Sequence, residues 1–165
     1  MMITLTGFMG SGKTTVGKVL ADFLGCPFFD LDDLSVKKAG KSIPDIFAQD
    51  GEAAFRQLEA KILRQQVEKY AESTVVLALG GGALLAPASA SLLHDKTVCI
   101  YLRASLDTLL QRLAGETAGR PLADASLADR LAFREPLYEE TAHVIIDTDG
   151  LTPDEVADEI IISAL

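Results

Sequence analysis

The fold of this chain is decided by the stretch Gly7-Phe8-Met9-Gly10-Ser11-Gly12-Lys13-Thr14. It fits the phosphate-binding pattern of a glycine, four free positions and then Gly-Lys-Ser or Gly-Lys-Thr. Residues 2–6, which precede it, are apolar and β-prone, as a first buried strand would be. Residues 15–24, which follow it, carry apolar side chains at helical spacing. A strand, a glycine-rich turn and a helix in this order predict a site for nucleotide phosphates.

The residue types in this stretch suit that ligand. Glycines let the backbone curl so that its N–H groups point inward at phosphate oxygens, and the helix N-terminus adds partial positive charge. Lys13 is a mobile cation for the β- and γ-phosphates, and Thr14 offers a hydroxyl to Mg²⁺. The stretch by itself does not distinguish a kinase from a hydrolase or a molecular switch.

Length and composition limit the class of protein. The chain has 165 residues, 48% of them hydrophobic, which predicts one globular domain with a substantial core. Its net charge of −9 argues against affinity for nucleic acid or an anionic membrane. Cys26 and Cys99 lack the spacing of metal ligands and are predicted to be small buried hydrophobes. With no signal peptide and no apolar run long enough to span a bilayer, a cytoplasmic protein is expected.

Short apolar runs alternate with helical patterns along the whole chain. Strands are predicted at residues 2–6, 27–30, 74–79, 97–102 and 144–147. Helical patterns separate them, the longest starting at Gly51 and running for about twenty residues. This alternation predicts an α/β fold: a single-domain three-layer sandwich over residues 1–165, with a five-stranded parallel sheet and helices on both faces.

Glycines and prolines set several expected boundaries. Short helices over residues 34–50 are expected to break at Gly40 and Pro44, and a helix that starts near Ser126 is expected to be interrupted at Pro136. Residues 114–124 have no periodicity and are predicted to form a mobile loop. Thr152 is expected to cap the last helix in a capping box with Glu155.

Acidic side chains follow the second predicted strand, where ligands of open α/β sheets gather. Asp30 and Asp32 point to the same side of an extended segment. One of them can hold a water on Mg²⁺ while the other accepts a hydrogen bond from a substrate hydroxyl. The alternative is a cluster that caps a helix N-terminus, with Asp33 as the capping residue.

Each of the next two candidate sites has a purely structural alternative. Arg56 and Glu59 share one face of the long helix, where they can form either a site or an exposed salt bridge. Three glycines, residues 80–82, directly follow a buried strand. They indicate either a close approach of the backbone to a ligand or a tight turn.

Three more arginines complete the candidates. Arg120 lies in the predicted loop, where a cation can close onto the phosphates as part of a lid or remain an ordinary exposed arginine. Arg134 precedes the expected break at Pro136, which can aim its side chain inward. Arg112, on the helix before the loop, can stack on an adenine face or lie at the surface.

Taken together, these motifs resemble the shikimate kinase family over nearly the whole chain. The resemblance rests on the phosphate loop, Asp30-Leu31-Asp32, the run from Ile46 to Glu52 leading to Arg56 and Glu59, Gly80-Gly81-Gly82, Arg120-Pro121-Leu122, and Arg134 followed by Pro136-Leu137-Tyr138. It implies transfer of the γ-phosphoryl group of ATP to the 3-hydroxyl of shikimate, with Mg²⁺, by a monomer. It also implies a substrate-binding helical region at about residues 31–60 and a lid at about residues 114–124.

The resemblance further assigns roles to individual residues. ATP would be bound by Gly10, Ser11, Gly12, Lys13, Thr14, Thr15, Arg112 and Arg120. Shikimate would be bound by Asp32, Arg56, Glu59, Gly80, Gly81, Gly82 and Arg134, with the two arginines on its carboxylate and Glu59 orienting Arg56. Thr14 and Asp30 would hold the metal ion, and Lys13, Asp32 and Arg120 would take part in catalysis.

Two other functions are compatible with the phosphate loop. One is another small-molecule kinase, such as a gluconate- or nucleoside-monophosphate-like enzyme, although two arginines and one aspartate suit a hydroxylated carboxylic acid better. The other is a nucleotide-binding module without turnover, for which a damaged catalytic set would be expected. Here Lys13, Thr14, Asp32 and Arg120 are all present.

Overall fold

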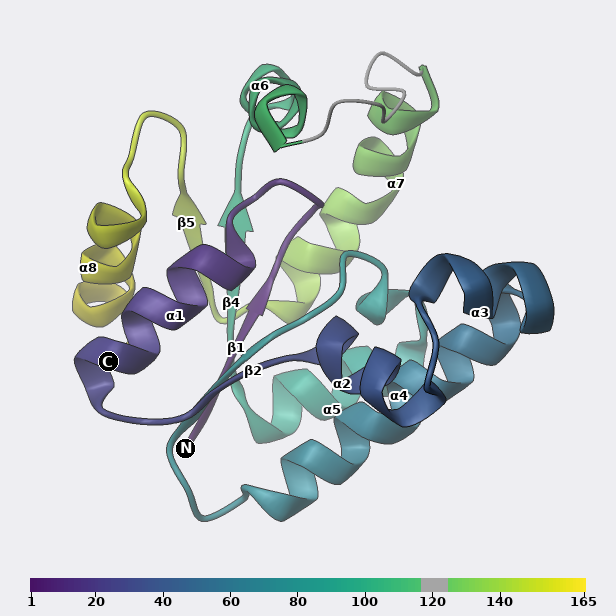
Figure 1. Ribbon diagram of the computed structural model, residues 1–165. Helices are drawn as coiled ribbons and strands as arrows, with labels where there is room; N and C mark the ends of the chain where they lie inside the picture. Colours follow the sequence, from purple (N-terminus) through teal and green to yellow (C-terminus); the bar gives the residue numbers. More distant parts are fainter. Residues whose placement is uncertain (117–124) are drawn as a thin grey trace.

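Five short strands pair side by side in one parallel sheet, as predicted (Figure 1). They are β1 (Met2–Thr6), β2 (Phe28–Asp30), β3 (Val75–Ala78), β4 (Val98–Arg103) and β5 (Val144–Asp147). Their order across the sheet is β2-β3-β1-β4-β5, so β1, which leads into the phosphate loop, occupies the centre. The computed structural model describes residues 1–116 and 125–165.

Helices connect the strands and cover both faces of the sheet (Figure 1). The helices are α1 (Lys13–Leu24), α2 (Leu31–Ala39), α3 (Ile43–Asp50), α4 (Glu52–Lys69), α5 (Pro87–Lys96), α6 (Leu106–Glu116), α7 (Ala125–Thr141) and α8 (Pro153–Ala164), with a 3₁₀ turn at Ala83–Leu85. Among the described residues, no helix combines the length and apolar character that a bilayer span requires.

The two faces of the sheet form two separate apolar layers, because side chains alternate along each strand. Ile3 and Leu5 of β1 point to the face that α1 and α8 cover, where Ile160 is fully buried. The opposite face carries Leu77 and Tyr101, which pack against α4, α5 and α7. Strands buried on both faces explain why these segments read as nearly continuous apolar runs.

Prolines interrupt the helices less than the sequence predicts. Pro44 lies in the first turn of α3, where its missing N–H has no intrahelical acceptor, so it starts that helix instead of breaking one. The expected interruption at Pro136 is wrong, because α7 continues through it to Thr141. Tyr138, two residues later, is fully buried against Tyr101 at 5.0 Å between ring centroids. Leu131, before the proline, is buried as well, so α7 packs on the core on both sides of Pro136.

Helix α2 begins earlier than expected, which changes the reading of the acidic cluster. Asp30 caps α2, and its Oδ1 accepts hydrogen bonds from the backbone N–H groups of Asp32 (2.9 Å) and Asp33 (3.4 Å). The prediction that Asp33 is the cap is therefore wrong, and Asp32 lies in the first helical turn rather than in an extended segment. The helix starts at Leu31 because that side chain is fully buried in the core.

The carboxyl ends of the parallel strands meet at one edge of the sheet. This edge carries the phosphate loop after β1, Asp30 at the end of β2, the glycine triplet after β3 and the segment that follows β5. Helix α6 extends to Glu116, so residues 114–116 of the predicted loop are helical. Thr152 forms the predicted capping box with Glu155. Residues 117–124 of the predicted lid, Arg120 included, lie outside the described residues.

Candidate active site

The phosphate loop joins β1 to the N-terminus of α1. Gly10 and Gly12 adopt φ values of 80° and 94°, a left-handed conformation that side chains disfavour. This conformation turns the loop back on itself, and the backbone N–H of Ser11 donates to the carbonyl of Phe8 at 3.1 Å. Gly10, Gly12, Lys13, Thr14 and Thr15 line a cavity of about 220 Å³ at the start of the helix. The loop thus offers an anion a concave site at a helix N-terminus.

Lys13 folds back over this loop. Its Nζ donates to the carbonyl oxygens of Gly7 (2.7 Å) and Phe8 (2.9 Å). Loss of hydration lowers the pKa of Lys13 to about 8, although the nearby Asp32 and Asp30 oppose that shift. A cation that is costly to bury gains most from an anion placed beside it, so this ammonium group is well suited to bind phosphate.

Thr14 and Asp30 bring two oxygen ligands together beside the phosphate loop. The Thr14 hydroxyl donates to Asp30 Oδ2 at 2.8 Å, and Oδ1 of the same carboxylate is engaged in capping α2. Hydroxyl and carboxylate oxygens are hard ligands of the kind that Mg²⁺ prefers. Within the described residues no group of three His, Cys, Asp or Glu side chains is placed to hold a metal. An ion at Thr14 and Asp30 would therefore share its coordination with water and substrate phosphates.

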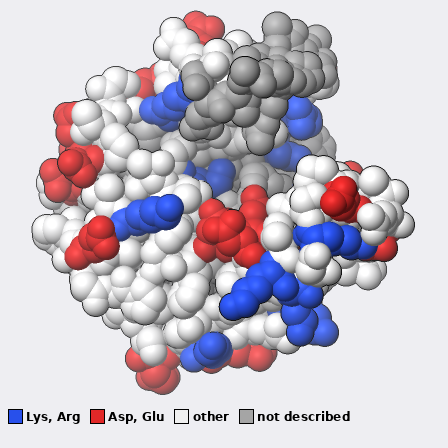
Figure 2. Space-filling view, viewed as in Figure 1, with Lys and Arg blue, Asp and Glu red and all other residues white. Residues whose placement is uncertain are grey.

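A second, larger cavity opens beside the phosphate loop, with a volume of about 670 Å³. We call it the acceptor cavity, and its size is within the range of small-molecule sites. Figure 2 shows acidic and basic side chains side by side around a hollow in this face of the molecule. The cavity is lined by Met9, Asp32, Asp33, Val36, Ile43, Pro44, Phe47, Glu52, Phe55, Arg56, Glu59, Gly80, Gly81, Gly82, Arg130 and Arg134.

Arg56 and Glu59 form a partly buried pair in the wall of the acceptor cavity, rather than an exposed salt bridge. Arg56 Nη1 lies 2.9 Å from Glu59 Oε1, and Nη2 lies 3.5 Å from Glu52 Oε1. Glu59 is only 3% exposed. Burial raises the pKa of Glu59, whereas the positive charge and hydrogen bond of Arg56 lower it. The pair holds the guanidinium of Arg56 in one orientation.

Asp32 reaches the same cavity from the first turn of α2. Burial raises the pKa of Asp32, and the negative charge of Asp30 adds to this shift, while Lys13 and Arg56 oppose it. A carboxylate that is incompletely solvated is a stronger hydrogen-bond acceptor for an incoming hydroxyl. Asp32 therefore has the surroundings expected of a group that orients a hydroxyl or accepts its proton.

The glycine triplet leaves room for these side chains, which is an explanation that the sequence did not offer. None of Gly80, Gly81 and Gly82 has a positive φ, so conformational freedom is not the reason for glycine here. A Cβ on Gly80 would lie 2.8 Å from both Asp32 Oδ1 and Glu59 Oε2. A Cβ on Gly82 would lie 2.6 Å from Arg56 Cζ and 2.7 Å from its Nη1. The backbone itself thus forms the floor on which the charged side chains rest.

This close contact predicts the effect of a single methyl group. We expect Gly82→Ala to raise the KM for the acceptor substrate about tenfold or more, because the guanidinium of Arg56 must move and a displacement of about 1 Å in a site is costly. The KM for ATP should stay within about twofold, since the phosphate loop is untouched. Steady-state kinetics with each substrate varied will measure both constants. An unchanged acceptor KM in a folded variant would show that the position of Arg56 does not matter for binding.

Arg134 enters the acceptor cavity from α7 and touches the phosphate loop. Its guanidinium lies over the ring of Phe8, 5.8 Å from the centroid. The Tyr138 hydroxyl, one turn further along the helix, donates to the carbonyl of Gly81 at 2.5 Å. Helix α7 is thereby fixed to the glycine triplet, and Arg134 faces the cavity without the helix break from which its orientation was predicted.

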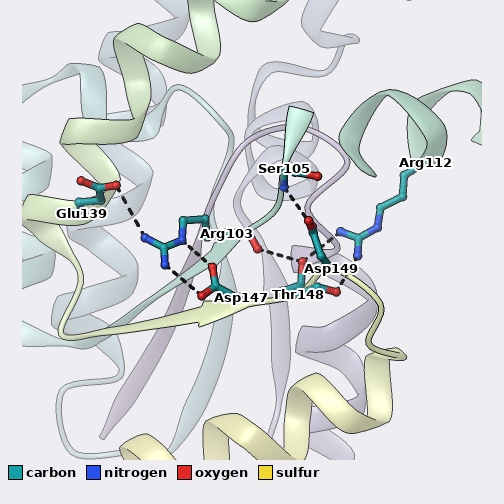
Figure 3. Close-up of polar contacts among 7 residues, drawn as sticks. All are labelled: Arg103, Ser105, Arg112, Glu139, Asp147, Thr148 and Asp149. Atoms are coloured by element: carbon teal, nitrogen blue, oxygen red, sulfur yellow. Dashed lines mark hydrogen bonds and ion pairs between the residues drawn. The ribbon is translucent and has the colours of Figure 1, made fainter. Parts of the chain in front are cut away.

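Arg112 links the phosphate loop to the segment after β5, and Figure 3 shows its contact with Thr148 of that segment. Its Nη1 and Nη2 donate to the hydroxyl and the carbonyl of Thr148, both at 3.2 Å, and Nη1 lies 3.4 Å from the carbonyls of Gly10 and Ser11. Arg112 is therefore half-buried and partnered, not a free surface side chain. Together with Thr15, Leu151 and Pro153, Arg112 borders a cavity of about 160 Å³. Its contact with adenine remains a prediction.

The sequence did not predict several residues that line the cavity beside Arg112 and the acceptor cavity. Thr148, Leu151, Pro153 and Val156 line the cavity beside Arg112, and the rule that ligands gather at strand carboxyl ends would have pointed to Thr148. In the acceptor cavity it missed Met9, Asp33, Val36, Ile43, Pro44, Phe47, Glu52, Phe55 and Arg130. Of these, Phe47 and Phe55 are in edge contact at 5.2 Å between centroids, an apolar wall that residue spacing alone does not reveal.

Relatives share the sequence of this chain over nearly its whole length. The sequence model of the family described as shikimate kinase matches residues 9–164. The shikimate kinase of Enterococcus faecalis is 41% identical over 164 residues, which cover 96% of this chain and 95% of that protein. The shikimate kinase of Limosilactobacillus fermentum is 45% identical over 166 residues, which cover 98% of this chain and 94% of that protein.

Solved structures agree with this relationship. The shikimate kinase of Acinetobacter baumannii, determined in complex with shikimate, superposes with a TM-score of 0.87 at 35% identity, covering 97% of this chain and 90% of that one. A gluconokinase from Sinorhizobium meliloti, with a TM-score of 0.60 at 20% identity, shares the fold alone. With its phosphate loop, its charged acceptor cavity and relatives matched over nearly their full length, this ATP-dependent kinase belongs to the shikimate kinase family.

Proposed function

We propose that this protein transfers the γ-phosphoryl group of ATP to the 3-hydroxyl of shikimate. The observation that carries the proposal is that two cavities share the phosphate loop. Lys13 and Thr14 line one of them, and Met9, from the same loop, lines the acceptor cavity with Asp32, Arg56 and Arg134. A nucleotide in the first cavity would place its terminal phosphate beside a hydroxylated acid in the second.

The phosphate loop acts on the donor in this reaction. Its backbone N–H groups and Lys13 bind the β- and γ-phosphates, and Thr15 and Arg112 border the path toward the base. When bound, Mg²⁺ supplies charge neutralisation at the phosphate oxygens, and Thr14 and Asp30 are the residues that would hold it. We assign Arg120, from the predicted lid, to the transferring phosphate by the family resemblance.

The acceptor cavity positions the attacking hydroxyl. Asp32 accepts a hydrogen bond from the 3-hydroxyl and can take its proton as the new O–P bond forms. Arg134 and the Glu59-oriented Arg56 bind the carboxylate, a planar anion that suits guanidinium groups. The Gly80–Gly82 backbone allows the ring to approach closely. Residues 31–60, which contribute α2, α3 and the start of α4, form the substrate-binding region.

We further propose that the protein works as a cytoplasmic monomer. This proposal follows the resemblance to the shikimate kinase family. Elution as a single species of about 18 kDa in size-exclusion chromatography with light scattering would be expected from the mass of 17.6 kDa.

Arg134→Ala separates acceptor binding from nucleotide binding. We expect the KM for shikimate to rise about a hundredfold, because a charge-assisted pair is lost, while ATP affinity stays nearly unchanged. The KM of Arg134→Lys for shikimate should lie between those of wild type and Arg134→Ala, since lysine keeps the charge and loses the bidentate geometry. Steady-state kinetics for shikimate and calorimetric titration of nucleotide test this. An unchanged shikimate KM would remove Arg134 from the acceptor site.

The assignment of the acceptor itself needs a panel of hydroxylated substrates. Purified protein is incubated with labelled ATP, Mg²⁺ and shikimate, gluconate, a nucleoside monophosphate or quinate. We expect efficient transfer to shikimate alone. Preferred transfer to gluconate or a nucleotide would overturn the proposal in favour of another small-molecule kinase, and nucleotide binding without any transfer would indicate a binding module.

A further inference from the structure

The acceptor cavity contains a third guanidinium that no motif predicted. Arg130 lies on α7 one turn before Arg134, and both side chains line the cavity. Residues four apart on a helix share a face, so the two guanidiniums approach the cavity from the same side. Arg130 is exposed whereas Arg134 is half-buried, which places Arg130 nearer the solvent.

The side chains that line this cavity do not carry an excess of positive charge. Four carboxylates, from Asp32, Asp33, Glu52 and Glu59, line it together with the three guanidiniums. Arg56 is shared between two of these carboxylates, at 2.9 Å from Glu59 and 3.5 Å from Glu52. Its positive charge is therefore largely offset before any substrate arrives.

The remaining positive charge lies on α7. Within residues 1–116 and 125–165, neither Arg130 nor Arg134 takes part in an ion pair. The whole chain carries a net charge of −9, so a substrate carboxylate meets repulsion over most of the surface. On one face of α7, two cations without an ion pair in the described part of the chain give the carboxylate a local region of favourable potential at the cavity.

We propose that Arg130 is a further acceptor-binding residue, which attracts the substrate carboxylate at the solvent side of the cavity and supports its docking on Arg134. This inference rests on the proposed function, because it takes a carboxylate-bearing acceptor for granted. Arg130 acts on capture of the substrate and not on the phosphoryl transfer itself. It therefore determines kcat/KM for anionic acceptors and leaves kcat almost unchanged.

The kinetic test compares charge variants at two positions. We expect Arg130→Ala to lower kcat/KM for shikimate about fivefold and Arg130→Glu about thirtyfold, with kcat and the KM for ATP within about twofold of wild type. Arg130→Lys should recover most of the loss, because the charge is retained. Arg64→Glu, an equal charge change at an exposed position of α4 outside the cavity, is the matched control and should have little effect.

Ionic strength separates attraction from a structural role. The deficit of Arg130→Ala should shrink as salt rises from 20 mM to 0.5 M, because the Debye length falls to a few ångströms. The methyl ester of shikimate, which keeps the hydroxyls and loses the charge, should inhibit wild type and variant equally. Wild-type kinetics in Arg130→Glu, or a deficit that is independent of salt, would overturn the inference while the proposed function stands. Failure of the wild type to phosphorylate shikimate would instead overturn the proposed function.

Discussion

Lys13→Met is expected to lower kcat by a factor of about 10³ while the protein still folds. Loss of one preorganised cation at a transferring phosphoryl group costs on the order of 10² to 10⁵ in rate, because little else neutralises the charge of the transition state. Lys13 lies at the start of α1 in the phosphate cavity, where its Nζ donates to two backbone carbonyls of the phosphate loop. Single-turnover measurement of phosphate transfer will give the rate directly.

The same variant has a distinctive effect on stability as the pH changes. The pKa of Lys13 is about 8 in the folded protein and has the ordinary value of 10.5 when the chain is unfolded. Below about pH 8 both states are protonated and the folded state bears the full cost of the buried charge. Between about pH 8 and 10.5 only the unfolded state stays charged, so this cost disappears. The stability of wild type relative to Lys13→Met should therefore rise over this window.

Denaturant unfolding of both proteins between pH 7 and 10.5 will measure the difference between their free energies of unfolding. Groups that both proteins share titrate alike, so their contributions cancel in this difference. Lys18→Met, an exposed position one turn and a half along the same helix, is the matched control. It should change neither the rate of transfer nor the pH dependence. A Lys13→Met enzyme with near-normal turnover would show that the phosphate loop does not hold the reacting phosphate.

Asp32→Asn is expected to lower kcat by a factor of about 10² to 10⁴, the usual contribution of a positioned acid or base. An amide still fits beside Gly80, but it neither accepts the proton nor orients the hydroxyl as a carboxylate does. The KM for ATP should stay close to wild type, because the donor site keeps Lys13 and Thr14. Asp33→Asn, in the same helical turn but exposed, should retain most of the activity.

Stability supplies an independent measure for Asp32. Burial and the charge of Asp30 raise the pKa of Asp32 in the folded state above its ordinary value of 3.8. Ionisation is therefore more costly in the folded than in the unfolded protein, and this cost grows as the pH rises through the raised pKa. Asp32→Asn removes the cost, so at neutral pH it should be at least as stable as wild type. A variant that is both inactive and clearly destabilised would point to a structural role instead.

The sheet could be predicted closely from the sequence because its signals are local. A parallel strand covered on both faces must be apolar throughout, so the runs at residues 74–79 and 97–102 identify β3 and β4 to within a residue. The glycines and lysine of the phosphate loop are likewise set by backbone conformation and ligand chemistry within eight residues. The helix break predicted at Pro136 was wrong, because α7 continues through this residue and its Tyr138 packs against Tyr101.

The site depended on contacts between distant segments, and there the sequence was less informative. The start of α2 was misplaced because it depends on the burial of Leu31, which brings Asp32 into a helical turn. Arg112 could not be assigned from its position on α6, since its partners lie on the phosphate loop and at Thr148. Arg130 carried no motif at all, and only the packing of α7 against the cavity distinguishes it from an exposed arginine.

By itself, the sequence determined the fold class, the phosphate loop and the residue types of a site for ATP and a hydroxylated acid. Hydrophobic periodicity and loop chemistry depend on residues that are close in sequence, so they can be recognised without a structure. The tertiary structure decided why residues 80–82 are glycines and which arginines of the acceptor cavity have no ion-pair partner among the described residues. Glu59 and Glu52 offset the charge of Arg56, and the glycine backbone makes room for that guanidinium. Both effects arise only when α4, α7 and the end of β3 come within a few ångströms of one another.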